Sequence, residues 1–273
     1  MRINNNLMSM NAHRQLTINT GLQGKSLEKL SSGYRINRAG DDAAGLSISE
    51  KMRGQIRGLT QASRNAQDGI SLIQTVEGNL NEVHSILQRM RELSVQAAND
   101  TNETEDRTAI AQEISSLTVE MDRISKATEF NKKKLLDGSI SDLRLQIGAN
   151  ADPDANGLII TFSQLDSTSL GLGAVDVSSY ANATAAITSI DNAIEQVSMV
   201  RSGLGAIQNR LEHTINNLDN AAENLQAAES RIRDADMAKE MMAFTKNNIL
   251  IQASTAMLAQ GNQAPQSVLQ LLR

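Results

Sequence analysis

Apolar residues repeat every seven positions along a stretch in the second half of the chain. The column consists of Ile190, Val197, Leu204, Leu211, Leu218, Leu225 and Ile232. A strict seven-residue repeat places one apolar seam along a helix, which can then pack lengthwise against a partner helix. At about 1.5 Å per residue, the stretch predicts a helical rod roughly 65 Å long.

Two further stretches carry helical patterns. The first column consists of Met52, Leu59, Ala66, Ile73, Leu80 and Leu87, with Val76, Val83, Met90 and Ala97 at the interleaved positions. A shorter stripe consists of Ile110, Ile114, Leu117, Met121 and Ile124. It follows a polar break at residues 99–106, where Asn102 or Thr104 is expected to cap the helix. Helices of this length are only marginally stable without packing, so we expect a mainly α fold: an elongated bundle of long, antiparallel, coiled-coil-like helices.

The pattern changes between residues 131 and 180. Glycine and proline interrupt the chain at Gly138, Gly148, Pro153, Gly157, Gly171 and Gly173, between the β-like runs 143–147 and 158–162. These signals predict two or three short strands joined by turns. We expect a small β-hairpin region that caps one end of the bundle.

The two ends of the chain combine helical spacing with few charges. Residues 241–273 hold only Lys246 and Arg273 as charged residues. The apolar positions are Ile3, Leu7 and Met10 at one end, and Met241, Phe244, Val268, Leu269 and Leu272 at the other. Neither end can bury its own stripe, so we expect the two terminal helices to fold when they pair with each other or with neighbouring copies.

Composition and charge narrow the possible functions. The chain has five aromatic residues, no cysteine and three histidines. Disulfide frameworks and thiolate metal sites are therefore excluded. The net charge of −5 gives no general attraction to nucleic acid. The charge is uneven along the chain: residues 1–60 hold nine basic and four acidic residues, whereas residues 141–200 hold one basic and seven acidic residues. No stretch reaches the roughly 18 apolar residues of a membrane span, and the first residues lack the apolar core of a secretory signal. We expect no membrane insertion, and export, if it occurs, by another route.

Few residues suggest chemistry. Asp41 and Asp42 could form an acid–base pair, but without a nearby histidine or metal ligand they fit better as the start of a helix. The basic run 132–134 and the cluster Lys51, Arg53 and Arg57 lack the interleaved aromatic residues of a nucleic-acid site, which favours solvated faces or salt bridges between subunits. We expect no catalytic, cofactor or metal site and no enzymatic activity.

Several long motifs are similar to those of bacterial flagellins, particularly the Gram-positive type. They are LSSGYRINRAGDDAAGL at residues 30–46, NAQDGI at 65–70, TEFN at 128–131, AESRIRD at 228–234 and QAPQSVLQLL at 263–272. The resemblance covers roughly residues 1–150 and 190–273. The remaining middle is too short for the variable outer domains of the family, so the chain resembles a minimal flagellin.

The resemblance implies a structural subunit that polymerises into the extracellular flagellar filament for swimming motility. It also implies export without a cleaved signal peptide, with an export chaperone, the filament cap and the hook-filament junction proteins as partners besides the chain itself. A hook-filament junction protein is the alternative within the same system. Growth of filaments from the pure protein would separate these functions from an enzyme or a membrane-bound adhesin.

The resemblance also divides the chain. Residues 1–43 and 236–273 would form the inner filament core, residues 44–130 and 181–235 the helical rod domain, and residues 131–180 its small β and turn region. The expected rod seam consists of Leu59, Ile73, Leu80, Leu87, Val197, Leu204, Leu211, Leu218 and Leu225.

One segment, residues 87–98, resembles the part of flagellin that the vertebrate toll-like receptor for this family reads. The matching positions are Arg89, Leu93 and Glu113. Arg89 and Leu93 lie four residues apart, so we expect them to project together from one exposed helix face. The competing interpretation is that Arg89 and Glu113 are solvated or join neighbouring subunits.

Overall fold

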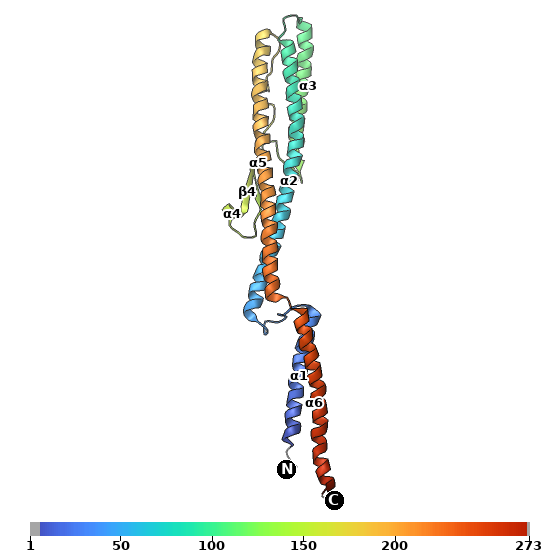
Figure 1. Ribbon diagram of the computed structural model, residues 1–273. Helices are drawn as coiled ribbons and strands as arrows, with labels where there is room; N and C mark the ends of the chain where they lie inside the picture. Colours follow the sequence, from blue (N-terminus) through green and yellow to red (C-terminus); the bar gives the residue numbers. More distant parts are fainter. Residues whose placement is uncertain (1–5, 272–273) are drawn as a thin grey trace. The chain divides into compact units, whose positions relative to one another are not determined.

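The computed structural model describes residues 6–271, with side chains as far as residue 263 (Figure 1). The helices are α1 (Leu7–Ser32), α2 (Ala43–Ala97), α3 (Thr104–Ala127), α4 (Pro153–Asn156), α5 (Tyr180–Arg233) and α6 (Met237–Leu271). The strands are β1 (Glu129–Phe130), β2 (Lys133–Lys134), β3 (Asp142–Gln146) and β4 (Gly157–Thr161). The prediction of long helices with a small β region is confirmed.

The chain forms two compact units. The terminal unit is Met1–Gly54 with Asn224–Arg273, and the rod unit is Gln55–Glu223. The units therefore divide within α2 and α5, whereas the sequence analysis placed the divisions near residues 43 and 236. The reason is that ion pairs join the first turns of α2 to the last turns of α5: Arg53 with Glu229, and Arg233 with Glu50.

Helices α2, α3 and α5 lie side by side in the rod unit (Figure 1). Arg91 on α2 pairs with Asp191 on α5, and Glu77 pairs with Arg201. The pair further along α2 involves the residue that comes earlier in α5, so the two helices run antiparallel. Each pair is half-exposed, so it sets register more than it adds stability.

The core of the rod unit is built from the seven-residue columns. Ile73, Leu80, Leu87, Val197 and Leu211 have no measurable exposure. Leu204 and Leu218 are also buried, whereas Leu59 and Leu225 at the ends of the columns are only half-buried. Ile110, Ile114 and Met121 add the buried face of α3. The central parts of the predicted columns, from Ala66 to Leu87 and from Ile190 to Leu211, therefore lie in one apolar core, and the column ends lie outside it.

The starts of two helices show how local polar groups satisfy free backbone donors. Asp42 Oδ1 accepts a hydrogen bond from the Gly45 N–H at 2.8 Å, so the prediction that Asp42 begins a helix is confirmed. The expected cap of α3 at Asn102 or Thr104 is wrong: the cap position is Glu103, whose N–H donates to Asp106. The Asp106 carboxylate, three residues after the cap, accepts the backbone N–H of Glu103. The usual preference for Asn, Asp, Ser or Thr at the cap does not predict a glutamate there.

The strands β3 and β4 pair antiparallel, with Leu145 opposite Leu158. The hairpin lies against the side of α2: Asn65 Nδ2 donates to the Gln146 carbonyl at 2.9 Å, and Leu145 packs directly onto Gly69. The expectation that it caps one end of the bundle is wrong. The hairpin can approach α2 closely because Gly69 has no side chain there and Asn65 supplies a hydrogen bond.

The segments around the hairpin close the core from one side. Asp122 on α3 accepts hydrogen bonds from the Ser167 N–H at 2.7 Å and from its hydroxyl at 2.9 Å. The hydroxyl of buried Ser125 donates to the Leu136 carbonyl at 2.8 Å. These bonds hold buried Leu136 and Leu165 over the helices without regular secondary structure.

Candidate functional site

The terminal helices α1 and α6 form an antiparallel pair that is tied by polar contacts near both ends (Figure 1). Asn6 Nδ2 donates to the Gly261 carbonyl at 2.6 Å. Beyond the other end of α1, the Ala235 N–H donates to the Gly33 carbonyl at 2.9 Å. Gly33 ends α1 in the left-handed conformation with φ of 73°, which allows the chain to turn there.

The seam between these two helices is polar and narrow. The buried residues of α1 are Asn19 and Ser26, and Gly261 is the buried residue among the described side chains of α6. An ordinary helix pair buries its apolar stripe. Among the described side chains, this pair fully buries only small and polar residues, and its apolar residues, such as Leu16 and Ile251, are at most half-buried.

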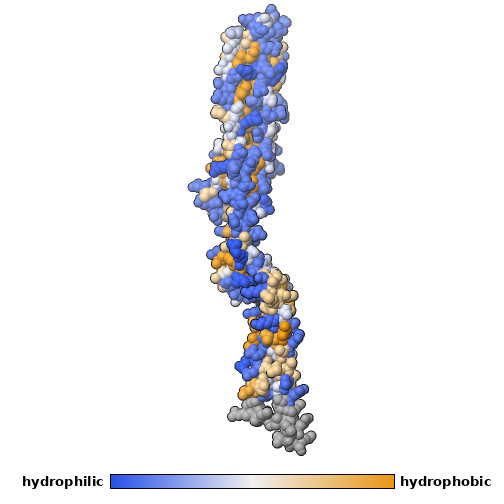
Figure 2. Space-filling model, viewed as in Figure 1, coloured by the Kyte–Doolittle hydropathy of each residue, from blue (hydrophilic) through white to orange (hydrophobic). Residues whose placement is uncertain are grey.

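The apolar side chains of the pair face outward. Those exposed on α1 are Leu7, Met8, Met10, Ile18, Leu22 and Leu27, and those on α6 are Met237, Met241, Met242, Ile249, Leu250 and Met257. Figure 2 shows apolar residues, interspersed with polar ones, on the visible face of this helix pair. An exposed apolar surface with this many residues is typical of an interaction site.

Three of the eight predicted packing residues at the two ends lie on this surface. Leu7 is 67% exposed, Met10 and Met241 are also exposed, and Phe244 is half-buried. The predicted residues Ile3 and Leu272 lie outside the described part of the chain. Val268 and Leu269 lie in α6, beyond the described side chains.

A cluster of charges around Tyr34 closes the other end of the terminal unit. The guanidinium carbons of Arg53 and Arg233 lie 5.5 and 5.0 Å from the Tyr34 ring centre. Arg53 Nε donates to Glu229 at 2.8 Å and its Nη2 donates to the Tyr34 hydroxyl at 3.2 Å. The sequence analysis treated Arg53 as part of a solvated or intersubunit basic cluster. That interpretation is wrong, because the partner comes from the same chain, within the motif at 228–234.

The charges of this cluster support one another. Burial disfavours the charge on Arg53, but hydrogen bonds to Tyr34 and Glu229 and the carboxylate charge outweigh burial, so the pKa of Arg53 is raised. Asp41 accepts the N–H groups of Arg38 and Asn37, and these bonds lower the pKa of Asp41. Both sets of contacts hold residues of the connection between α1 and α2.

The structure brings Arg89 and Glu113 together on the rod unit. Arg89 Nη2 donates to Glu113 at 2.9 Å, and its Nη1 donates to Glu92 at 3.2 Å. The hydrogen bonds to Glu113 and Glu92 raise the pKa of Arg89. The expected exposure of Leu93 is wrong, because its side chain is only 2% exposed. Since α2 packs against both α3 and α5, its buried face is wider than one seam and includes Leu93.

Among residues 6–263, no three histidine or acidic side chains gather closely enough to hold a metal ion. No helix in the described part of the chain is long and apolar enough to cross a membrane. The site to be explained is therefore the exposed apolar surface of α1 and α6.

Two family models match the chain. The model of the bacterial flagellin N-terminal helical region matches residues 3–141, and that of the C-terminal helical region matches residues 187–272. Both of the terminal helices and the motif at residues 30–46 fall within these matches. The unmatched segment, residues 142–186, contains β3, α4, β4, the loops that follow and the first turns of α5.

Named relatives resemble the chain over its whole length. Flagellin of Halalkalibacterium halodurans is 62% identical over 273 residues, and flagellin of Bacillus subtilis is 55% identical over 305 residues. In each case the match covers all of this chain and all of the relative. The crystal structure of Bacillus cereus flagellin is 33% identical, with a TM-score of 0.51 over 61% of this chain and 94% of that one.

The family models cover most of the chain, and two full-length relatives share more than half of its residues. The chain therefore belongs to the bacterial flagellin family.

Proposed function

We infer that the paired helices α1 and α6 form the inner core of a flagellar filament built from many copies of this chain. As a flagellin, the chain is a structural subunit of the filament and not an enzyme, as the sequence predicted. The same relatives give no support to the alternative of a hook-filament junction protein. What the family does not settle is which part of this chain makes the contacts between subunits.

The uncovered apolar surface carries this proposal. Twelve apolar side chains of α1 and α6 are exposed, while the seam between the helices holds Asn19 and Ser26. At about 25 cal/mol for each Å² of apolar surface removed from water, covering such a surface strongly favours assembly. Copies of the same helix pair are the natural cover, because they present the same apolar side chains around a common axis.

The same surface supports the remaining partners and the extracellular location. Exposed Met and Leu side chains on α6 require a cover before assembly, which is the role of an export chaperone. A chain without cysteine can pass unfolded through a narrow export channel without forming disulfides on the way. We propose that the chain is exported without a cleaved signal, is added at the filament cap and contacts the hook-filament junction proteins at the base.

Recognition by the toll-like receptor is a second proposal, resting on Arg89 and Glu113. Their ion pair lies on an exposed face of α2 and α3, where a partner can contact both side chains. Leu93 supplies no exposed apolar anchor beside them. With monomeric protein in a receptor reporter assay, we expect Arg89→Ala to lower potency. Equal potency of a folded Arg89→Ala variant would contradict this proposal.

Removal of the terminal helices tests the filament proposal. The full chain and a fragment of residues 44–235 are incubated with short filament seeds and examined by electron microscopy. We expect filaments from the full chain only, and circular dichroism should show that the fragment remains helical. Native-like filaments from the fragment would show that α1 and α6 are not the inner core.

A further inference from the structure

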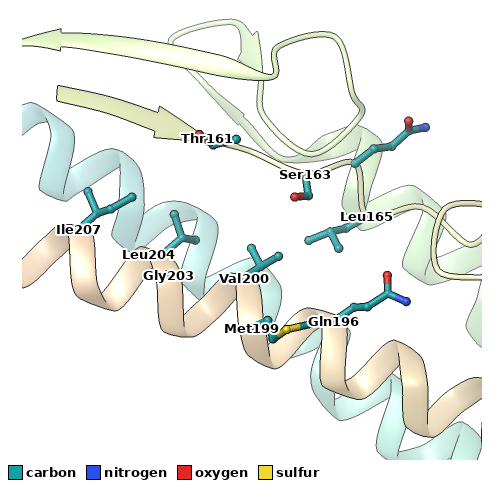
Figure 3. A pocket seen from close by; sticks show the side chains of 10 residues that line it. Thr161, Ser163, Leu165, Gln196, Met199, Val200, Gly203, Leu204 and Ile207 are labelled. Atoms are coloured by element: carbon teal, nitrogen blue, oxygen red, sulfur yellow. The ribbon is translucent and has the colours of Figure 1, made fainter. Parts of the chain in front are cut away.

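A groove of about 440 Å³ crosses the rod unit between α5 and the segment that follows β4. Figure 3 shows Thr161 and Leu165 on one side of it and Val200 and Leu204 on the other. Leu165 and Leu204 are buried, whereas Met199, which lies on α5 like Leu204, is 60% exposed. The groove is therefore an open, largely apolar depression with a flexible methionine beside it.

Gly203 leaves room within this groove. A side-chain carbon added at Gly203 would meet no atom of the chain within 4 Å. The depression can thus accept a side chain from outside without any movement of α5.

An unpaired acidic residue continues the line of the groove. Glu195, Met199 and Gly203 are four residues apart, so they lie along one stripe of α5. Glu195 is exposed, and among the described residues it takes part in no ion pair. It belongs to the segment 141–200, which has seven acidic residues and one basic residue. A partner for this stripe should combine an apolar side chain with a positive charge.

Helix α3 presents such a stripe. Val119 is 66% exposed, and Lys126 lies seven residues later on the same helix face. Lys126 is exposed and forms no ion pair with any described residue. Residues 123–134 contain five basic residues and one acidic residue. The two stripes are therefore complementary in charge, and each has an apolar position beside the charged one.

The lengths of the stripes also agree. At about 1.5 Å per residue, Val119 and Lys126 are separated by roughly 10.5 Å along α3, and Gly203 and Glu195 by roughly 12 Å along α5. With the two helices antiparallel, Val119 enters the space above Gly203 while Lys126 meets Glu195.

We propose that the groove beside Gly203 receives Val119 from a second copy of this chain, with Lys126 of that copy paired to Glu195. The inference rests on the proposed filament and adds a contact of the rod unit to the contacts of α1 and α6. The groove and the α3 stripe are different patches of one chain. Each subunit therefore receives one neighbour in its groove and places its α3 stripe in the groove of another. Such head-to-tail contacts repeat without closing and are suited to an open helical polymer.

Filling the groove tests the contact in the full chain. Gly203→Leu places a side chain where Val119 would enter, and Gly205→Leu is the matched control, since Gly205 is also a glycine of α5 with open space around it. We expect both variants to fold, because leucine favours helix over glycine. Seeded growth should fall by about tenfold for Gly203→Leu and stay within about twofold for Gly205→Leu. Equal growth of the two variants would overturn the proposal.

Cysteine pairing gives an independent measurement, because the chain has no cysteine. Val119→Cys and Gly203→Cys subunits are mixed, grown into filaments and oxidised. We expect a disulfide-linked dimer from the mixture and none when Gly205→Cys replaces Gly203→Cys. Absence of the dimer in well-formed mixed filaments would contradict the contact, whereas failure of the unmodified chain to form filaments would contradict the proposed function itself.

Discussion

The rod unit and the terminal unit are both built from long antiparallel helices, yet the rod helices bury an apolar core whereas α1 buries two polar residues. In the rod unit, Leu80, Leu87 and Leu211 have no measurable exposure. In the terminal unit, α1 buries Asn19 and Ser26 and exposes Leu7 and Leu22. Helical periodicity is present in both, so the pattern predicts a helix without saying whether that helix can be stable within one subunit.

The difference separates stability from assembly. The rod unit has the apolar core that a folded monomer requires, and the terminal pair has the exposed apolar surface on which the proposed assembly rests. In the terminal unit the Tyr34 cluster fixes the chain with charged and aromatic groups, where the rod unit uses apolar packing. Substitutions in the rod core should therefore change the unfolding of the monomer, whereas substitutions on the exposed surface of α1 and α6 should change filament growth.

The largest loss of monomer stability is expected for Leu211→Asp. The change buries an unpaired carboxylate in the rod core, which should lower the free energy of unfolding by about 3–5 kcal/mol. Urea unfolding of the monomer, followed by circular dichroism, measures it. Leu211→Met is the control, with an expected loss below about 1.5 kcal/mol. Similar unfolding midpoints for the aspartate variant and the unmodified chain would mean that the column does not form the core.

Asp122→Ala should have the next largest effect. It removes the acceptor of both hydrogen bonds from Ser167, which should cost about 1–3 kcal/mol and loosen the segment beside it. Asp122→Asn keeps one acceptor oxygen and should lose less. Hydrogen exchange at residues 165–172 reports the loosening, and unchanged protection there would rule out the anchoring role.

Tyr34→Ala tests the charged cluster of the terminal unit. Loss of the ring should cost about 1–2 kcal/mol, because two guanidinium groups lose their cation–π contacts. Tyr34→Phe retains the ring and loses only the hydroxyl contact with Arg53, so it should remain close to the unmodified chain. Limited proteolysis of the connection at residues 33–42 measures the effect. Equal cleavage of the alanine and phenylalanine variants would argue against a role for the ring.

Acid should weaken the rod unit by a smaller amount. Hydrogen bonds from Ser139, Ser169 and Ser178 lower the pKa values of Asp137, Asp166 and Asp176 respectively. A lowered pKa in the folded state adds stability above the ordinary value of about 3.9, and this stability is lost as the pH falls through the folded pKa.

Thermal unfolding should therefore be constant from neutral pH to about pH 5 and should move to lower temperature below about pH 4. The change should be shallower in a variant with asparagine at all three aspartate positions. An equally steep acid dependence in that variant would assign the effect to other groups.

The smallest effect on the monomer is expected for Met242→Asp, although the effect on assembly should be large. Met242 is 67% exposed, so the free energy of unfolding should change by less than about 0.5 kcal/mol. Seeded filament growth should be lost, because the charge would be buried between subunits. Gln252→Asp places the same charge at an exposed polar position of α6 and serves as the control. Normal growth of Met242→Asp would remove α6 from the assembly surface.

The sequence by itself determined the long helices, the central buried positions of the seven-residue columns and the family. These follow from local information, because a seven-residue repeat specifies a helix face and long motifs specify relatives. It also determined that Asp42 begins α2, since capping depends on residues only a few positions apart.

Only the tertiary structure decided which apolar faces are covered. Leu93 and Leu7 are both apolar residues of long helices, but α3 and α5 surround the face of α2 that bears Leu93, while no part of the described chain covers Leu7. The place of the β3–β4 hairpin beside Gly69 and the pairing of Arg53 with Glu229 likewise join residues far apart in the chain. Burial depends on such distant neighbours, and a periodic pattern in one segment carries no information about them.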